Sequence, residues 1–186
     1  MLRKHCIDEV MDVRSSPSSR YSPHFNYAIL NAALEEAGIG YVFLGGELGG
    51  RPVDRSCYDE QGRVRYDRLA NSDLFEDGIR RVVRAADERR VAVMCSEKEP
   101  LDCHRALLIA KVLEERGVTV EHILADGSVE GHDVTMNRLM DIFKLPHNGD
   151  LFRSRNEVIA DALARRAKKV AYIAEGPPAD SQRYAY

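Results

Sequence analysis

Two cysteines, a glutamate and a histidine lie within one short stretch of the chain, from Val91 to Arg105. Cys95 and Cys103 offer thiol groups, which become nucleophiles or metal ligands when they lose a proton. Glu97 offers a carboxylate, and His104 offers an imidazole that titrates near neutral pH. These side chains could support nucleophilic or acid–base chemistry, or they could bind a soft metal ion.

The elements on either side of this stretch predict where it lies in the fold. Val91 to Met94 is an uninterrupted apolar run with two β-branched residues, which is typical of a buried strand. Apolar residues recur at helical spacing after Cys103, and Gly117 marks the expected end of that helix. In open α/β sheets the ligand crevice lies where strands end, and the helix N-termini there favour anions. We therefore expect a ligand site at this point.

The rest of the chain predicts strands and helices in alternation. Strands are expected at 7–13, 41–44 and 118–124, and helices at 25–37, 67–86, 132–143 and 155–173. A long connection without periodicity is expected at 45–62. This alternation favours an α/β fold with three layers, in which a mainly parallel, doubly wound sheet is flanked by helices. Residues 1–145 are expected to form this domain. Residues 146–186 are expected to add a linker and a C-terminal helical extension packed on it, frayed from Gly176 onward.

Length and composition limit the classes of protein to consider. The chain has 186 residues and a net charge of −3, which fits one domain and argues against general electrostatic attraction to nucleic acid. It has no apolar run approaching about eighteen residues and no signal-peptide pattern, so we expect a cytoplasmic protein without a membrane partner. Its four cysteines are irregularly spaced, which indicates reduced thiols rather than a disulfide framework.

Several further residues follow directly after the predicted strands. Asp12 and Arg14 end the first strand, Gly45 follows the second and Cys95 the third, so a parallel sheet would bring them to one edge. Arginine side chains bind phosphate with two parallel hydrogen bonds. We therefore expect an anion-binding crevice built from this edge and its loops, with the ligand-binding residues Asp12, Arg14, Ser19, Arg20, Gly45, Arg51, Cys103 and Arg105. The alternative is that Arg14 simply pairs with Asp12.

Two motifs of the chain, with shorter matches around them, occur together in one known family. The first is Asp12-Val13-Arg14 with Pro17 and Ser19-Arg20, and the second is the Cys95-Ser96-Glu97 loop that ends in Cys103-His104-Arg105. Shorter matches include Leu48-Gly49-Gly50-Arg51 and Asp126-Gly127 with His132. In this combination the chain resembles, over nearly its whole length, the bacterial and archaeal family known as domain of unknown function 488 (DUF488). The resemblance implies a family but no activity.

The N-terminus departs from that family. Members usually begin with a strand that ends in a Gly-His-Ser-like motif, followed by a helix that leads into the Asp-Val-Arg strand. Here the segment from Met1 to His5 resembles the last turn of that helix. Our hypothesis is that the gene start was placed too late or that this is a naturally short variant. In both cases a strand is missing, and the exposed apolar edge is expected to favour a homodimer or poor behaviour.

A nucleophilic role for Cys95 is one alternative. The order of motifs is similar to that of sulfurtransferases of the rhodanese type and of cysteine phosphatases, whose short loops cradle an anion around the cysteine. In phosphatases an arginine follows six positions later, whereas Arg105 is ten positions after Cys95. The loop between them carries three carboxylates and no glycine, and negative charge opposes both a thiolate and an anion.

A metal site is another alternative. Cys95, Cys103 and His104 are soft ligands. The tetrahedron could be completed by His132, Cys57 or Glu97. Two observations oppose this interpretation: the spacing of the ligands is not a standard one, and adjacent residues such as 103 and 104 point in different directions on a regular helix.

Two classes of function remain open from the sequence. The first is a small enzyme that acts on a phosphorylated or nucleotide-like ligand, with Cys95, Glu97 and His104 nearest the reacting atoms. In that enzyme His104 would carry a proton and Glu97 would be its partner. The second is a non-catalytic protein that binds nucleic acid through the same basic loops, which strong salt dependence would reveal. A metal-binding or sulfurtransferase-like protein is the third hypothesis.

Overall fold

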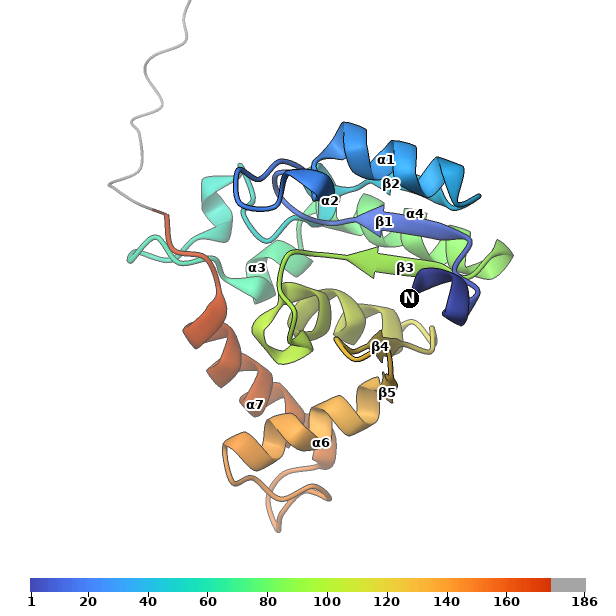
Figure 1. The fold of residues 1–186 in the computed structure, drawn as a ribbon. Helices are drawn as coiled ribbons and strands as arrows, with labels where there is room; N and C mark the ends of the chain where they lie inside the picture. The colour runs from blue at the N-terminus through green and yellow to red at the C-terminus, as the bar shows by residue number, and fades with distance from the viewer. Residues whose placement is uncertain (175–186) are drawn as a thin grey trace, which may run out of the picture.

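A computed structural model describes residues 1–174, so the frayed end expected from Gly176 lies outside the described residues. Three parallel strands form the central sheet in the order β2-β1-β3 (Figure 1). They are β1 (Glu9–Asp12), β2 (Gly40–Phe43) and β3 (Val91–Met94). The register pairs Asp12 with both Phe43 and Met94, so the three strands end at the same level. The predicted parallel sheet of an α/β fold is confirmed.

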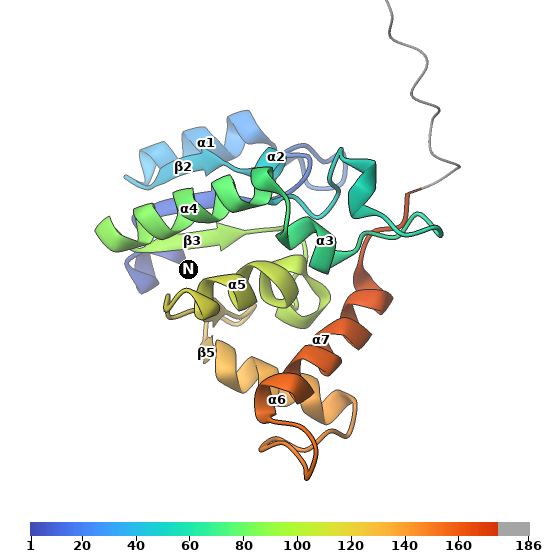
Figure 2. The ribbon, with the colours of Figure 1, turned by 180° about the vertical axis from the view of Figure 1, so that it is seen from behind.

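Helices cover both faces of this sheet because alternate side chains of each strand point to opposite sides. Val10 packs in a cluster with Leu30 and Leu34 of α1 (Tyr27–Glu36). Met11, the next residue, packs in a cluster with Phe75 and Ile79 of α4 (Asp73–Glu88) on the other face. Figure 2, seen from behind, shows α4 lying across β1 and β3. The chain thus winds in both directions from β1, with one apolar cluster on each face.

The connections contain more helical turns than the sequence predicts. The further helices and turns are η1 (Leu2–His5), η2 (Pro23–Phe25), α2 (Gly45–Leu48), η3 (Arg55–Cys57), α3 (Tyr66–Ala70), η4 (Pro100–Asp102), the π-helix η5 (Arg105–Ala110), α5 (Lys111–Glu115), α6 (His132–Ile142) and α7 (Arg155–Val170). The long connection expected at 45–62 contains two of these short elements, α2 and η3. The short α2 begins at Gly45, where a Cβ atom would lie 2.0 Å from the carbonyl oxygen of Arg14, so only glycine allows this approach.

The strand predicted at 118–124 is shorter than expected and has a different partner. It forms β4 (Glu121–Ile123), which pairs antiparallel with β5 (Val129–Gly131) and does not join the parallel sheet. The turn between them is the predicted one, in which Asp126 accepts hydrogen bonds from the backbone and hydroxyl of Ser128. The sequence missed β5 because its three residues carry no apolar alternation.

Strand β3 leaves one edge without a partner strand among residues 1–174. Its four residues are half-buried, and a groove of about 720 Å³ separates them from residues 118–123. This groove borders the outer edge of β3. The homodimer expected from such an edge stays a prediction.

The C-terminal part packs onto the helices that follow β3. Helix α7 begins with a capping box, in which Ser154 and Glu157 exchange side-chain and backbone hydrogen bonds. Its buried residues Val158, Ala162 and Leu163 join a cluster with Leu139 and other residues of α6, and with Leu101 and Leu107. Within the described part of the chain, no helix combines the length and the apolar character that crossing a bilayer requires.

Candidate functional site

The four side chains singled out by the sequence converge at the end of β3. Cys95 directly follows the strand, Glu97 lies in the loop, and Cys103 and His104 lie between η4 and the π-helix. One ligand atom from each residue lies within 4.8 Å of the other three. Cys103 and His104 are buried, Cys95 is half-buried, and only Glu97 is exposed. The cluster is therefore a mostly buried group of donor atoms, with Glu97 as its exposed member.

An irregular turn makes this convergence possible. Cys103 has an extended backbone (φ −124°, ψ 140°), whereas His104 already has helical angles (φ −61°, ψ −19°). Because the two residues do not belong to one regular helix, their side chains can face the same point. The objection that adjacent residues diverge on a helix thus does not apply here. The π-helix that follows is a rare conformation that recurs at functional sites.

The distances within the cluster suit a small cation. Nδ1 of His104 lies 3.7 Å from Sγ of Cys95 and 3.8 Å from Sγ of Cys103. Bond lengths of about 2.3 Å to sulfur and 2.05 Å to nitrogen place such atoms about 3.6 Å apart around a tetrahedral zinc ion. Oε2 of Glu97 lies 3.1 Å from Sγ of Cys103 and supplies a fourth donor atom.

The orientation of His104 is fixed from outside the cluster. Its Nε2 lies 3.0 Å from the carbonyl oxygen of Leu48, the last residue of α2. A carbonyl only accepts, so Nε2 carries the proton and Nδ1 presents its lone pair to the two thiols. Gly50 borders the ring, since a Cβ atom there would lie 3.2 Å from Nδ1. Leu48 stood out in the sequence only as part of a short family-like match, and its contact with His104 could not be predicted because that contact uses the backbone.

Three acidic groups lie close together in the cluster, namely the thiols of Cys95 and Cys103 and the carboxylate of Glu97. A hydrogen bond from Cys95, with further help from the charge of Arg105, lowers the pKa of Cys103, although burial opposes this shift. The same pairing, with burial and the charge of Glu97, raises the pKa of Cys95. Although burial opposes it, hydrogen bonds from both thiols lower the pKa of Glu97. A raised pKa opposes Cys95 as a free nucleophile, and a cation at the centre would relieve the crowding of negative charge.

Arg105, one of the expected anion ligands, makes two hydrogen bonds to the cluster and its loop. Its backbone N–H donates to Sγ of Cys103 at 3.4 Å, and its guanidinium donates to the carbonyl oxygen of Glu97 at 2.8 Å. The first contact stabilises negative charge on the sulfur, and the second holds the loop that carries Glu97. The expected partnership of Glu97 with His104 takes a different form, because the hydrogen bonds of Glu97 join it to the thiols.

Asp12 and Arg14 form a buried ion pair at the same edge of the sheet. Arg14 donates from Nε to both carboxylate oxygens at 2.9 and 3.0 Å and from Nη2 at 2.6 Å. Tyr41 donates its hydroxyl to the same carboxylate at 2.7 Å, and the carbonyl of Phe25 accepts a further bond from Nη2. The hydrogen bond to Asp12 raises the pKa of Arg14. The pair is 0% and 7% exposed, so it supports the alternative of an internal ion pair.

The remaining expected anion ligands have separate surroundings. Ser19 accepts hydrogen bonds from the backbone of Tyr21 and Ser22 within its own loop. Arg51 stacks over the ring of Tyr172 at 4.5 Å, and Arg20 is exposed, with no side-chain hydrogen bond to another residue of the range 1–174. Gly45 is buried at the start of α2, as described above. Anion binding at this edge therefore stays a prediction.

The other two candidates for a fourth metal ligand lie elsewhere. Cys57 is buried in the apolar cluster beneath α4, outside the group of converging donors. His132 pairs with His122, whose Nε2 lies 3.0 Å from Nδ1 of His132. Of the three candidates only Glu97 lies beside the two thiols.

This histidine pair predicts an acid-sensitive fold. Burial, with the neighbouring His132, lowers the pKa of His122 from its ordinary 6.5 to about 4, and burial also lowers the pKa of His132. Between pH 6.5 and pH 4, His122 binds a proton in the unfolded chain but not in the folded chain. The free energy of unfolding therefore falls as the pH drops from 6.5 toward 4. The expected loss from His122 is about 3 kcal/mol.

The measurement is urea denaturation at a series of pH values. His122→Gln is expected to lose part of the acid-induced drop, whereas the exposed His24→Gln is expected to behave as the parent does. An unchanged drop in His122→Gln would contradict this origin of the acid sensitivity.

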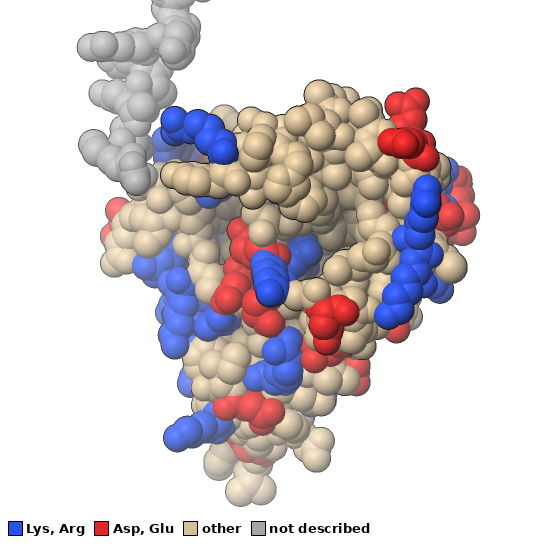
Figure 3. Space-filling model, in the orientation of Figure 1, with Lys and Arg blue, Asp and Glu red and all other residues tan. Residues whose placement is uncertain are grey.

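The surface charge is mixed. Figure 3 shows Lys and Arg side chains interspersed with Asp and Glu over the face seen in Figure 1, without a large area of one sign. Such a pattern agrees with the small net charge. On this face it gives no support to the nucleic-acid hypothesis, which calls for a basic stripe or patch.

Comparison with known proteins identifies one family. Its model, Domain of unknown function DUF488, matches residues 1–112. The match includes all four donors and ends within α5, before β4 begins. No curated protein and no solved structure matches the chain significantly.

Proposed function

The chain belongs to the DUF488 family, described only as a domain of unknown function, and we propose from its geometry that it binds a soft divalent metal ion, best fitted by zinc. The observation that carries the proposal is the convergence of Cys95, Glu97, Cys103 and His104 within 4.8 Å. Two sulfurs, one imidazole nitrogen and one carboxylate oxygen form a donor set that zinc accepts and that magnesium or calcium does not.

The surroundings support the proposal independently of the donors. Metal-bound histidines commonly donate their second ring nitrogen to a carbonyl or carboxylate, and the carbonyl of Leu48 fills that role for His104. The N–H of Arg105 on the Cys103 sulfur is the corresponding contact for a thiolate. These contacts orient the ligands before any ion arrives.

The exposure of Glu97 suggests how such a centre would act. Three ligands are wholly or partly buried, whereas the carboxylate of the exposed Glu97 can be replaced by a water or a substrate atom. Catalytic zinc sites keep three protein ligands and one exchangeable position. We therefore propose that the hypothesis of an enzyme acting on a phosphorylated or nucleotide-like ligand be tested on the zinc-loaded protein, with the substrate approaching from the Glu97 side.

A redox-active dithiol is the second candidate. Cys95 and Cys103 are both free cysteines and lie in the same cluster, so exchange with a small-molecule disulfide, which leaves as two thiols and takes up the two electrons and two protons, could join them in place of a metal. The two candidates predict different masses for the same protein.

Native mass spectrometry after equilibration with one equivalent of zinc and excess magnesium distinguishes them. The metal proposal predicts one bound zinc per chain, which is lost on denaturation and leaves four free thiols. Failure to retain zinc, together with a denatured mass lower by two hydrogens, would overturn the metal proposal and favour the dithiol.

A further inference from the structure

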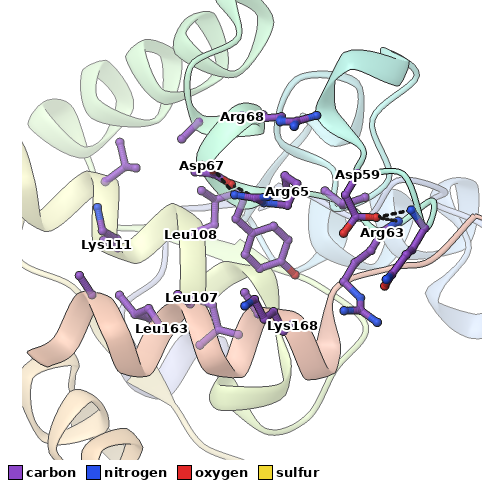
Figure 4. Close-up of a pocket in the computed structure, with 18 of the residues that line it drawn as sticks. Asp59, Arg63, Arg65, Asp67, Arg68, Leu107, Leu108, Lys111, Leu163 and Lys168 are labelled. Carbon is purple, nitrogen blue, oxygen red and sulfur yellow. Dashed lines mark hydrogen bonds and ion pairs between the residues drawn. The ribbon is translucent and has the colours of Figure 1, made fainter.

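A second cavity lies on the other side of the helices that follow β3. It has a volume of about 820 Å³ and is bounded by residues 59–70, by the π-helix with α5, and by α7 (Figure 4). None of the four donors of the cysteine cluster lines it. A proposal about this cavity therefore stands apart from the metal site.

The floor of the cavity is apolar. Leu107 and Leu108 project from the π-helix and Leu163 projects from α7 on the opposite wall (Figure 4). Small side chains of α7 keep the trough open, and they are Ala160, Ala164 and Ala167. A hydrocarbon or aromatic body would gain by leaving water for this surface.

Most charges on the rim are already committed to protein partners. Arg65 binds Asp67 through two hydrogen bonds of 3.0 and 2.9 Å. Arg68 donates to backbone carbonyls, and Lys111 pairs with Glu115 one turn further along its helix. The carboxylate of Asp59 accepts from backbone N–H groups at residues 61 and 63. These groups hold the walls together.

Two basic side chains on the rim have no such partner among residues 1–174. The guanidinium of Arg63 makes no hydrogen bond there, and its Nε is the one buried side-chain nitrogen or oxygen of the described residues that lacks a partner. Lys168 projects from α7 toward the same end of the cavity, with Lys111 at the opposite end (Figure 4). An unpaired buried N–H costs free energy that an acceptor would recover.

We propose that this cavity binds a small organic monocarboxylate with an apolar body. The planar fork of Arg63 matches a carboxylate, and Lys168 adds a second positive charge beside it. Asp59 and Glu60 also line this region, so one negative charge is favoured over the two of a phosphate. The apolar body lies along the leucine and alanine trough.

Calorimetric titration of the full chain with three probes tests the proposal. Octanoate combines both features, acetate lacks the apolar body, and 1-octanol lacks the charge. Octanoate is expected to bind at least about tenfold more tightly than either of the others, in the presence and in the absence of zinc. Equal binding of octanoate and octanol, or no binding of octanoate, would overturn the proposal.

Variants locate the binding. Arg63→Gln and Lys168→Gln are each expected to weaken octanoate binding about tenfold, whereas the neighbouring Lys169→Gln, whose side chain lies over Phe143, should leave it unchanged. Ala164→Phe fills the trough from an exposed helix position and is expected to abolish binding without affecting the fold. Binding that survives all three cavity variants would place the ligand elsewhere and overturn the assignment.

Discussion

Replacement of Cys103 with serine is expected to weaken zinc binding by more than about 100-fold. Loss of a residue that only hydrogen-bonds to a metal ligand can already weaken binding by up to about 100-fold, and loss of the ligand itself should cost more. Cys103 lies centrally among the donors, because its sulfur contacts Glu97, His104 and the N–H of Arg105. Serine has nearly the same shape but offers a hydroxyl, which zinc binds poorly in place of a thiolate.

Denaturant unfolding with and without zinc measures this change. Zinc at 100 times its dissociation constant should add about 2.7 kcal/mol to the unfolding free energy of the parent protein and almost nothing to that of Cys103→Ser. Cys6→Ser is the matched control, because Cys6 is exposed and outside the cluster. Glu97→Gln changes the exposed ligand without disturbing the core. It is expected to lose a smaller part of the stabilisation by zinc than Cys103→Ser loses. Equal stabilisation of all four proteins by zinc would contradict the assignment.

Removal of the buried carboxylate of Asp12 is expected to destabilise the fold by about 3–5 kcal/mol. Asp12→Ala leaves the guanidinium of Arg14 without its counter-charge and leaves the hydroxyl of Tyr41 without its acceptor. Burial together with the bond to Asp12 also raises the pKa of Tyr41. The cost is therefore that of an uncompensated buried charge.

Urea denaturation supplies the measurement, and the exposed pair of Arg65 and Asp67 supplies the control. Those side chains are 45% and 63% exposed, so Asp67→Ala is expected to cost less than about 1 kcal/mol. The double variant Asp12→Ala with Arg14→Met is expected to recover part of the loss, because no charge is then left unpaired. Equal costs for Asp12→Ala and Asp67→Ala would show that the buried pair does not act as described.

The main elements of the fold were predictable because their patterns are local. The apolar run of β3 has the bounds that the sequence predicts, β1 lies within its predicted range, and β2 begins and ends one residue earlier than predicted. Strand β5 has no apolar pattern, and it exists because the Asp126-Gly127 turn folds it back onto β4. An Asp-Gly pair is a strong hairpin signal that could have located it.

The members of the cysteine cluster were predictable, but their convergence was not. Residue types and spacing singled out Cys95, Glu97, Cys103 and His104. The irregular turn before the π-helix, which aims Cys103 and His104 at one point, leaves no mark in the sequence.

The role of Arg14 was hard to predict because the sequence allows two roles for it. Its position two residues after Asp12 suits both a ligand contact and an internal ion pair, and only the packing of the sheet edge distinguishes them.

X-ray absorption at the zinc edge of the protein loaded with one equivalent of zinc tests the central claim most directly. It counts the atoms bound to the metal and measures their distances. Two sulfur neighbours at about 2.3 Å and two nitrogen or oxygen neighbours at about 2.0–2.1 Å are predicted. A shell made only of nitrogen and oxygen would contradict the account, because it would place the ion away from Cys95 and Cys103.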